Sequence, residues 1–195
     1  MLRVRRALMV ASLVLAAHTA MAGTYTFQPG DHDLYDLNHD YAYEWGIEFD
    51  VPENEVVIGA SIFFNRIRNW DDRSNDLYVT LLDSDFVGIS TSYDHQGGGD
   101  YFATQGLLLE HYEDLSSSAQ NITYHFDPDE TVQLKTNLAD DLFGIGFDPD
   151  CHFYNCGITL TIETDEGGGS TVPEPLAGSI LLGGIATMAA RRRRR

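Results

Sequence analysis

Basic residues are scarce in this chain, except at its two ends. Between residues 7 and 190 there are only four lysines and arginines against all 30 acidic residues, which gives this section a formal charge of −26. Such a surface repels nucleic acid and anionic lipid, and it attracts cations. We therefore expect no nucleic-acid partner.

The chain also lacks the short motifs of the common enzyme classes. It contains no G-x-S-x-G, no H-E-x-x-H, no P-loop and no G-x-G-x-x-G. Carboxylate pairs suited to glycoside hydrolysis arise by chance in a sequence so rich in acids. We therefore expect a non-enzymatic protein and assign no catalytic residues, with a secreted polysaccharide hydrolase as the alternative.

Cysteine is nearly absent, and Cys151 and Cys156 are the two examples. In an oxidising compartment a disulfide between them is the default, and its short loop would limit the entropic stabilisation to under about 3 kcal/mol. Two free thiols are a second interpretation. A zinc site with His152 is a third, although it would have only three ligands in view.

Aromatic residues, by contrast, are plentiful, with ten Tyr, ten Phe and two Trp, which excludes a disordered acidic chain. Residues 23–166 contain short apolar runs separated by Gly, Asp, Asn and Pro, a pattern typical of strands and turns. Within residues 56–67 the alternation places the even-numbered residues Val56 to Phe64 on one side and the odd-numbered ones on the other. We predict an all-β body, a jelly-roll-like β-sandwich.

One stretch of the body departs from the strand pattern. Asp127 is a good helix cap, Pro128 suits the first helical position, and Glu130 stands at the third. Leu134 and Leu138 follow at a four-residue interval. The sequence therefore predicts one short helix near residues 128–139.

The first 22 residues have the order of a secretory signal peptide. Arg3, Arg5 and Arg6 precede an apolar run from Ala7 to Ala17, and Ala20-Met21-Ala22 supplies small residues at the cleavage site. We expect export from the cytoplasm and cleavage before Gly23.

The C-terminal segment, residues 167–195, has three parts. A flexible linker, GGGST (167–171), leads to the stiff element Val172-Pro173-Glu174-Pro175. The apolar run Leu176–Ala190 would reach only about 22 Å as a helix, against a hydrocarbon core of about 30 Å. The arginines that follow would hold this end in the cytoplasm and leave the acidic body outside: Arg191, Arg192, Arg193, Arg194 and Arg195.

This order of linker, VPEP, short apolar segment and arginine cluster resembles the PEP-CTERM protein-sorting signal of Gram-negative bacteria, many of which make exopolysaccharide. The resemblance covers about residues 172–195. It implies insertion into the inner membrane, recognition by an exosortase at Pro173-Glu174-Pro175 and removal of the tail. The body would then reach the cell surface or the extracellular matrix of a biofilm.

The body itself resembles the acidic domains that accompany this signal in other secreted proteins. The residues that carry the likeness are YAYEWGIEF (41–49), IRNWDDRSNDLYVTLLD (67–83) and GFDPDCHFYNCGITLTIE (146–163). The likeness implies a β-rich domain outside the cytoplasm and no defined activity.

Acids gather in the predicted turns at spacings that suit calcium. Asp72 and Asp76 flank one turn, and Asp148 and Asp150 another. Calcium prefers carboxylates and backbone carbonyls, and weak sites fill outside the cell. These four residues are our candidate ligands, while the alternative is that Asp simply favours turns.

A Gly-rich loop with aromatic residues at both ends, SYDHQGGGDYF (92–102), is the candidate ligand-binding loop. Tyr93 and Tyr101 could stack on sugar rings of a polysaccharide, while Asp94 and Asp100 bind hydroxyl groups. The alternative is a hairpin connection whose aromatic residues complete the core.

Overall fold

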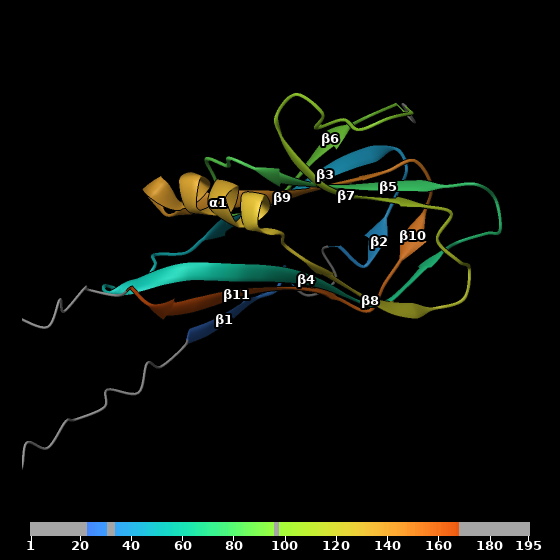
Figure 1. The fold of residues 1–195 in the computed structure, drawn as a ribbon. Coiled ribbons are helices and arrows are strands. Elements are labelled where there is room, and N and C mark those ends of the chain that lie inside the picture. Colours follow the sequence, from blue (N-terminus) through green and yellow to red (C-terminus); the bar gives the residue numbers. More distant parts are fainter. Residues whose placement is uncertain (1–22, 31–33, 96–97, 168–195) are drawn as a thin grey trace, which may run out of the picture.

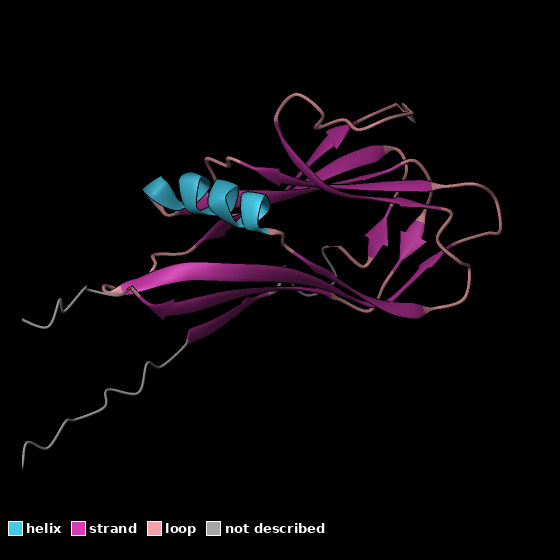
Figure 2. Ribbon diagram, viewed as in Figure 1, coloured by secondary structure: helices cyan, strands magenta, loops and turns pink. Residues whose placement is uncertain are grey.

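A computed structural model describes residues 23–30, 34–95 and 98–167 of the chain. Most of these residues form β-strands, and the described part contains one α-helix (Figures 1 and 2). The elements in chain order are β1 Gly23–Phe27, β2 Asp36–Leu37, β3 Tyr41–Glu48, β4 Glu55–Asn69, β5 Asp76–Leu82, β6 Gly88–Tyr93, β7 Gly106–Glu113, β8 Gln120–His125, α1 Pro128–Asn137, the 3-10 turn η1 Leu138–Asp140, β9 Leu142–Pro149, β10 Phe153–Tyr154 and β11 Ile158–Glu166.

The strands form two antiparallel sheets, which lie as two layers in Figure 1. The first sheet has the order β1-β11-β4-β10-β2, and β8 pairs with β4 as well. The second has the order β6-β3-β9-β5-β7. This confirms the predicted all-β class with two sheets and a single helix.

Apolar side chains fill the space between the two layers. Phe64 of β4 and Phe147 of β9 are fully buried, and their rings meet edge to face with centroids 6.0 Å apart. Because these strands belong to different sheets, this contact is one of those that join the layers. The same cluster includes Leu134 of α1, which has no exposed surface.

The helix begins where its local sequence predicts. The Asp127 side chain accepts a hydrogen bond from the Glu130 backbone N–H at 2.8 Å, and Glu130 Oε2 accepts one from the Asp127 N–H at 2.7 Å. This reciprocal capping box satisfies two backbone donors that the helix itself leaves free. The helix contacts β4 of one sheet and β7 and β9 of the other, so it covers one end of the core.

Among the residues that the structure describes, no helix is long and apolar enough to cross a membrane. The predicted signal peptide (1–22), the sorting element (172–175), the apolar run (176–190) and the arginine cluster (191–195) all lie outside the described residues.

Candidate metal-binding site

The register of the second sheet gathers several acidic turns at one end of the protein. Strands β3 and β5 begin there, and β6, β7 and β9 end there. The pairs that fix this alignment are Tyr41 with Tyr93, Tyr43 with Phe147, Leu77 with Pro149 and Asp76 with Glu113. We call this the acidic end of the second sheet.

Three aspartates from two separate segments converge at the acidic end. Asp94 follows β6, Asp148 lies near the end of β9, and Asp150 comes just after that strand. Each offers one carboxylate oxygen, and these three oxygens lie within 4.8 Å of one another. We call these residues the aspartate triad.

Asp148 is the most unusual member of the triad because it has no exposed surface. Its Oδ2 atom accepts a hydrogen bond from the Tyr101 backbone N–H at 2.7 Å, whereas its Oδ1 atom is buried and has no hydrogen-bond partner among the described residues. Asp150 repeats the arrangement, with Gly99 N–H donating to Oδ2 at 3.2 Å and a buried Oδ1 left unpaired. A buried carboxylate oxygen without a partner is costly, so both atoms fit the ligands of a cation.

Burial and crowding disfavour the ionised carboxyl groups. Burial, with a smaller contribution from the nearby charges of Asp94, Asp150 and Asp100, raises the pKa of Asp148 to about 7 against the opposing hydrogen bond from the Tyr101 N–H. Burial also raises the pKa of Asp150. Either a proton or a bound cation would relieve the repulsion, and a divalent cation would restore the charged form.

The loop that carries the backbone donors is anchored on the outer face of the sheet. Phe102 is 3% exposed and packs with Ala42 and Leu82, and its ring lies directly over Gly146 of β9. A Cβ atom at Gly146 would come within 2.7 Å of that ring. The glycine therefore permits the close approach that brings Tyr101 to Asp148, two residues further along β9.

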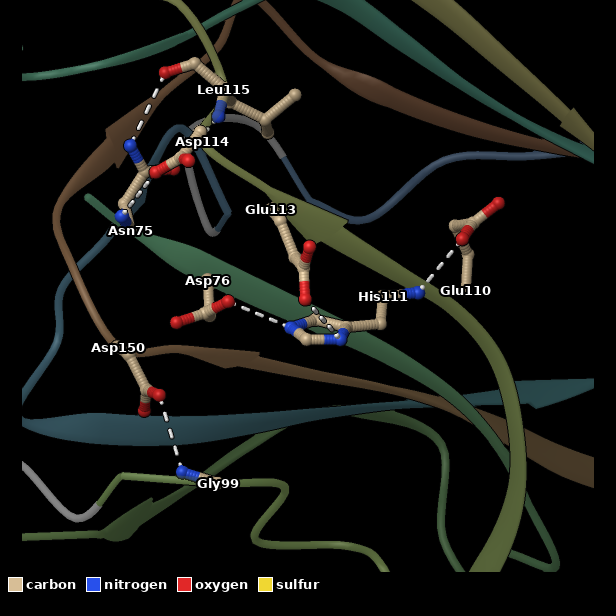
Figure 3. A network of polar contacts seen from close by, with 9 residues as sticks. All are labelled: Asn75, Asp76, Gly99, Glu110, His111, Glu113, Asp114, Leu115 and Asp150. Atoms are coloured by element: carbon tan, nitrogen blue, oxygen red, sulfur yellow. Dashed lines mark hydrogen bonds and ion pairs between the residues drawn. The ribbon is translucent and has the colours of Figure 1, made fainter.

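A second group lies beside the triad, formed by Asp76, His111 and Glu113 (Figure 3). His111 Nε2 is 2.8 Å from Asp76 Oδ1, and the Asp76 carbonyl accepts a hydrogen bond from the Asp150 N–H at 2.9 Å. The His111 ring also stacks on Tyr78, with centroids 4.2 Å apart. This group could also hold a metal ion, but its imidazole and carboxylate already bind each other.

The structure brings together part of the predicted calcium set. Asp148 and Asp150 are joined by Asp94, which the sequence assigned to the ligand loop. Asp76 belongs to the second group instead, and Asp72 accepts a hydrogen bond from Ser117 in another loop and belongs to neither group. No local spacing identifies Asp94 as a partner of Asp148, because only the sheet register brings them together.

The candidate ligand loop divides into exposed and buried aromatic residues. Tyr93 is 55% exposed and Tyr101 is 37% exposed, whereas Phe102 is buried. Tyr93 contacts Tyr41 and His95 edge to face, with centroids 5.6 Å and 4.3 Å apart. Asp100 holds the loop itself, since its Oδ1 accepts a hydrogen bond from the Phe102 N–H at 2.8 Å.

Cys151 and Cys156 are free, so the predicted disulfide is not formed. The residues between them include β10, which is held extended by pairing with β2 on one side and β4 on the other, rather than folding back on itself. Cys151 packs against the core and Cys156 is exposed. No group of potential metal ligands among the described residues includes either cysteine, so the structure gives the zinc interpretation no support.

Fold and site together define a mostly β protein with two antiparallel sheets and acidic groups that could bind a metal ion. No model of a known protein family matches the chain, and no curated protein matches it.

Proposed function

We propose that this chain is a calcium-binding, non-enzymatic protein of the cell surface or extracellular matrix, delivered by an exosortase-type system and associated with exopolysaccharide. The observation that carries the calcium site is the fully buried Asp148, which has an unpaired Oδ1 atom and offers one carboxylate oxygen within 4.8 Å of oxygens of Asp94 and Asp150. Such a site would let a non-catalytic surface protein bind polysaccharide, because a cation can bridge protein carboxylates to sugar oxygens.

The ligand chemistry favours calcium over other metals. The triad offers oxygen atoms alone, and hard cations such as calcium and magnesium prefer oxygen. Calcium accepts irregular sets of about six to eight oxygens, whereas magnesium demands a near-ideal octahedron. Water and sugar hydroxyls would complete the set, which suits a site that also binds a ligand.

A jelly roll is the arrangement that we propose for the body. Four strands in the order β1-β11-β4-β8 face four in the order β3-β9-β5-β7. The order in which the chain forms these eight strands matches a double Greek key. Strand β6 and the two-residue strands β2 and β10 are additional to the eight. Lectin domains are among the proteins with this architecture. The support for a sugar partner from this comparison is an analogy of fold alone.

The export and sorting part of the proposal depends on the two ends of the sequence. The order of basic, apolar and small residues in 1–22 supports a signal peptide. The VPEP element, apolar run and five arginines of 172–195 support transient membrane insertion and exosortase processing.

Processing has a direct test in the mass of the mature protein isolated from its native host. We expect an N-terminus at Gly23 and a C-terminus near residues 172–175, because the signal peptide and the tail are removed. Intact-mass and peptide mass spectrometry measure both ends. A mature protein that keeps its arginine tail would contradict exosortase processing and leave the calcium site untouched.

Polysaccharide binding is expected to depend on calcium. The full-length chain should bind uncharged glycans of a bacterial glycan array in calcium, lose that binding in excess chelator, and recover it when calcium returns. Asp150→Asn should weaken binding at least about ten-fold, which corresponds to about 1.4 kcal/mol. Asp85→Asn is the matched control, because Asp85 is an exposed aspartate with the same Asp-x-Asp spacing outside the triad. No binding to any glycan in either condition would remove the sugar partner from the proposal.

A secreted polysaccharide hydrolase is the competing function. Close carboxyl groups, one with a raised pKa, are features that glycoside hydrolases use, and Asp148 beside Asp150 has both. However, Asp148 has no exposed surface, so a glycosidic oxygen does not reach it. We therefore favour the cation-binding function.

A further inference from the structure

A second candidate site lies on the other sheet, where β10 and the start of β8 run beside the end of β4 (Figure 1). A pocket of about 330 Å³ is found there, at the lower end of the range for small-molecule sites. Its lining residues are Arg66, Arg68, Ala119, Tyr154, Asn155 and Cys156.

An irregularity in β4 places both arginines on the outer face. Before it, the buried residues of the strand are even-numbered, as in Ile62 and Phe64, and after it they are odd-numbered, as in Ile67. The register with β8 shifts between Phe64 and Ile67, and Arg66 has a φ of 54°. A bulge of this kind redirects side chains. Without it, Arg66 would point into the core.

Specific contacts hold the bulge and the walls of the pocket in place. The Arg66 backbone N–H donates to Asn121 Oδ1 of β8 at 2.9 Å. The Arg68 guanidinium lies over the Tyr154 ring, 5.4 Å from its centroid, in the geometry of a cation–π contact. Asn155 is buried and bonded to the Leu34 carbonyl, so it forms a fixed wall of the pocket.

The charges of this pocket are unusual for so acidic a protein. Arg66 and Arg68 are two of the four basic residues between positions 7 and 190. Among the described residues neither guanidinium forms an ion pair, whereas Arg73 pairs with Asp71 at 3.4 Å. No acidic residue lines the pocket. Two exposed guanidinium groups are therefore available to an anion from outside.

We propose that Arg66 and Arg68 bind the carboxylate of an acidic sugar, with Tyr154 positioning Arg68. The guanidinium fork matches a carboxylate with two parallel hydrogen bonds, and the pocket volume suits a single sugar unit better than a long segment. This inference rests on the proposed association with polysaccharide and names its chemistry, a chain that contains hexuronate residues. Binding here uses no cation, so it is separate from the aspartate triad.

The test is binding of a short uronate oligosaccharide, digalacturonate, to the full-length chain in excess chelator, measured by calorimetry. A short ligand is chosen because the acidic body repels long polyanions. We expect binding that Arg66→Gln and Arg68→Gln each weaken at least ten-fold, while Arg73→Gln, which removes the same charge outside the pocket, leaves it unchanged. Thermal unfolding of each variant shows whether the fold is kept.

Four results would overturn the assignment. They are the absence of binding in chelator, equal binding of a neutral disaccharide, an equal loss in Arg73→Gln, and displacement of the uronate by inorganic phosphate or sulfate at the same concentration. The last result would define a general anion site. If the chain does not bind the uronate in chelator but keeps calcium-dependent binding of uncharged glycans, the proposed function stands and only this pocket is removed from it.

Discussion

Asp148→Asn is expected to remove most of the stabilisation of the protein by calcium. At a calcium concentration about 100-fold above the dissociation constant, the wild-type chain should gain about 2.7 kcal/mol, or roughly 5–10 °C in melting temperature for a domain of this size. The substitution removes the buried charge that faces Asp94 and Asp150. A loss of affinity of about 100-fold would reduce the gain to about 0.4 kcal/mol at the same concentration.

The choice of asparagine keeps the fold comparable. Its side-chain oxygen can still accept the hydrogen bond that Tyr101 N–H donates to Asp148 at 2.7 Å, so the loop should keep its anchor. Asp72→Asn is the matched control, because it removes one charge from a residue outside both acidic groups. Differential scanning calorimetry with and without calcium measures the effect. An unchanged calcium shift in Asp148→Asn, or the same loss in Asp72→Asn, would exclude the triad as the calcium site.

The same substitution is expected to stabilise the protein when calcium is removed. Asp148 has an ordinary pKa of 3.8 in the unfolded chain, and burial raises the folded value to about 7. The folded state therefore favours the protonated acid, and this contribution is fully present below about pH 4. It is lost as the pH rises toward 7, because the unfolded chain then ionises freely while the buried group does not.

Asparagine cannot ionise, so in chelator at pH 8 Asp148→Asn should be more stable than the wild type by on the order of 1–3 kcal/mol, after allowing for solvent screening. The charged groups that raise the pKa of Asp148 are Asp94, Asp100 and Asp150. His111 acts on Asp150, where it lowers the pKa. Urea unfolding from pH 4 to pH 8 measures the difference between the two proteins. A difference that does not change with pH would mean that Asp148 titrates normally in the folded state.

These two results would have opposite signs for one residue. The carboxylate that binds the cation is also the charge that the calcium-free protein has to bury. Removing this charge therefore lowers the affinity for calcium and raises the stability of the calcium-free protein. Such a conflict between stability and activity is typical of functional sites, and a carboxylate with only a structural role would not produce it.

Local sequence chemistry correctly predicted the elements that depend on neighbours in the chain. The helix begins at Asp127 and Pro128 because a capping box needs only residues three apart. The strands follow from short runs of apolar and β-branched residues between turn formers. Which side chains of residues 56–67 face the core was only partly predictable. Val56 and Ile58 were expected on the side of Ile62, yet both are exposed, while Val57 is buried.

The pairing of strands explains that difference. The register between β11 and β4 shifts between Glu163 and Thr164, which face Gly59 and Val57. An extra residue at such a bulge moves the following side chains to the opposite face. The pattern within residues 56–67 cannot show this shift, because the shift depends on a strand about 100 residues further along the chain.

The sequence by itself determined that this chain has an acidic body of strands with one capped helix, and that Asp148 and Asp150 lie two residues apart, although Asp148 belongs to the end of β9 rather than to a turn. Tertiary structure alone decided that Asp94 joins them, that Asp72 does not, and that Arg66 and Arg68 face outward. The physical reason is range. Propensity, capping and charge act between near neighbours, whereas a site with buried, unpaired oxygens exists only after sheet pairing has brought distant segments together and excluded water from them.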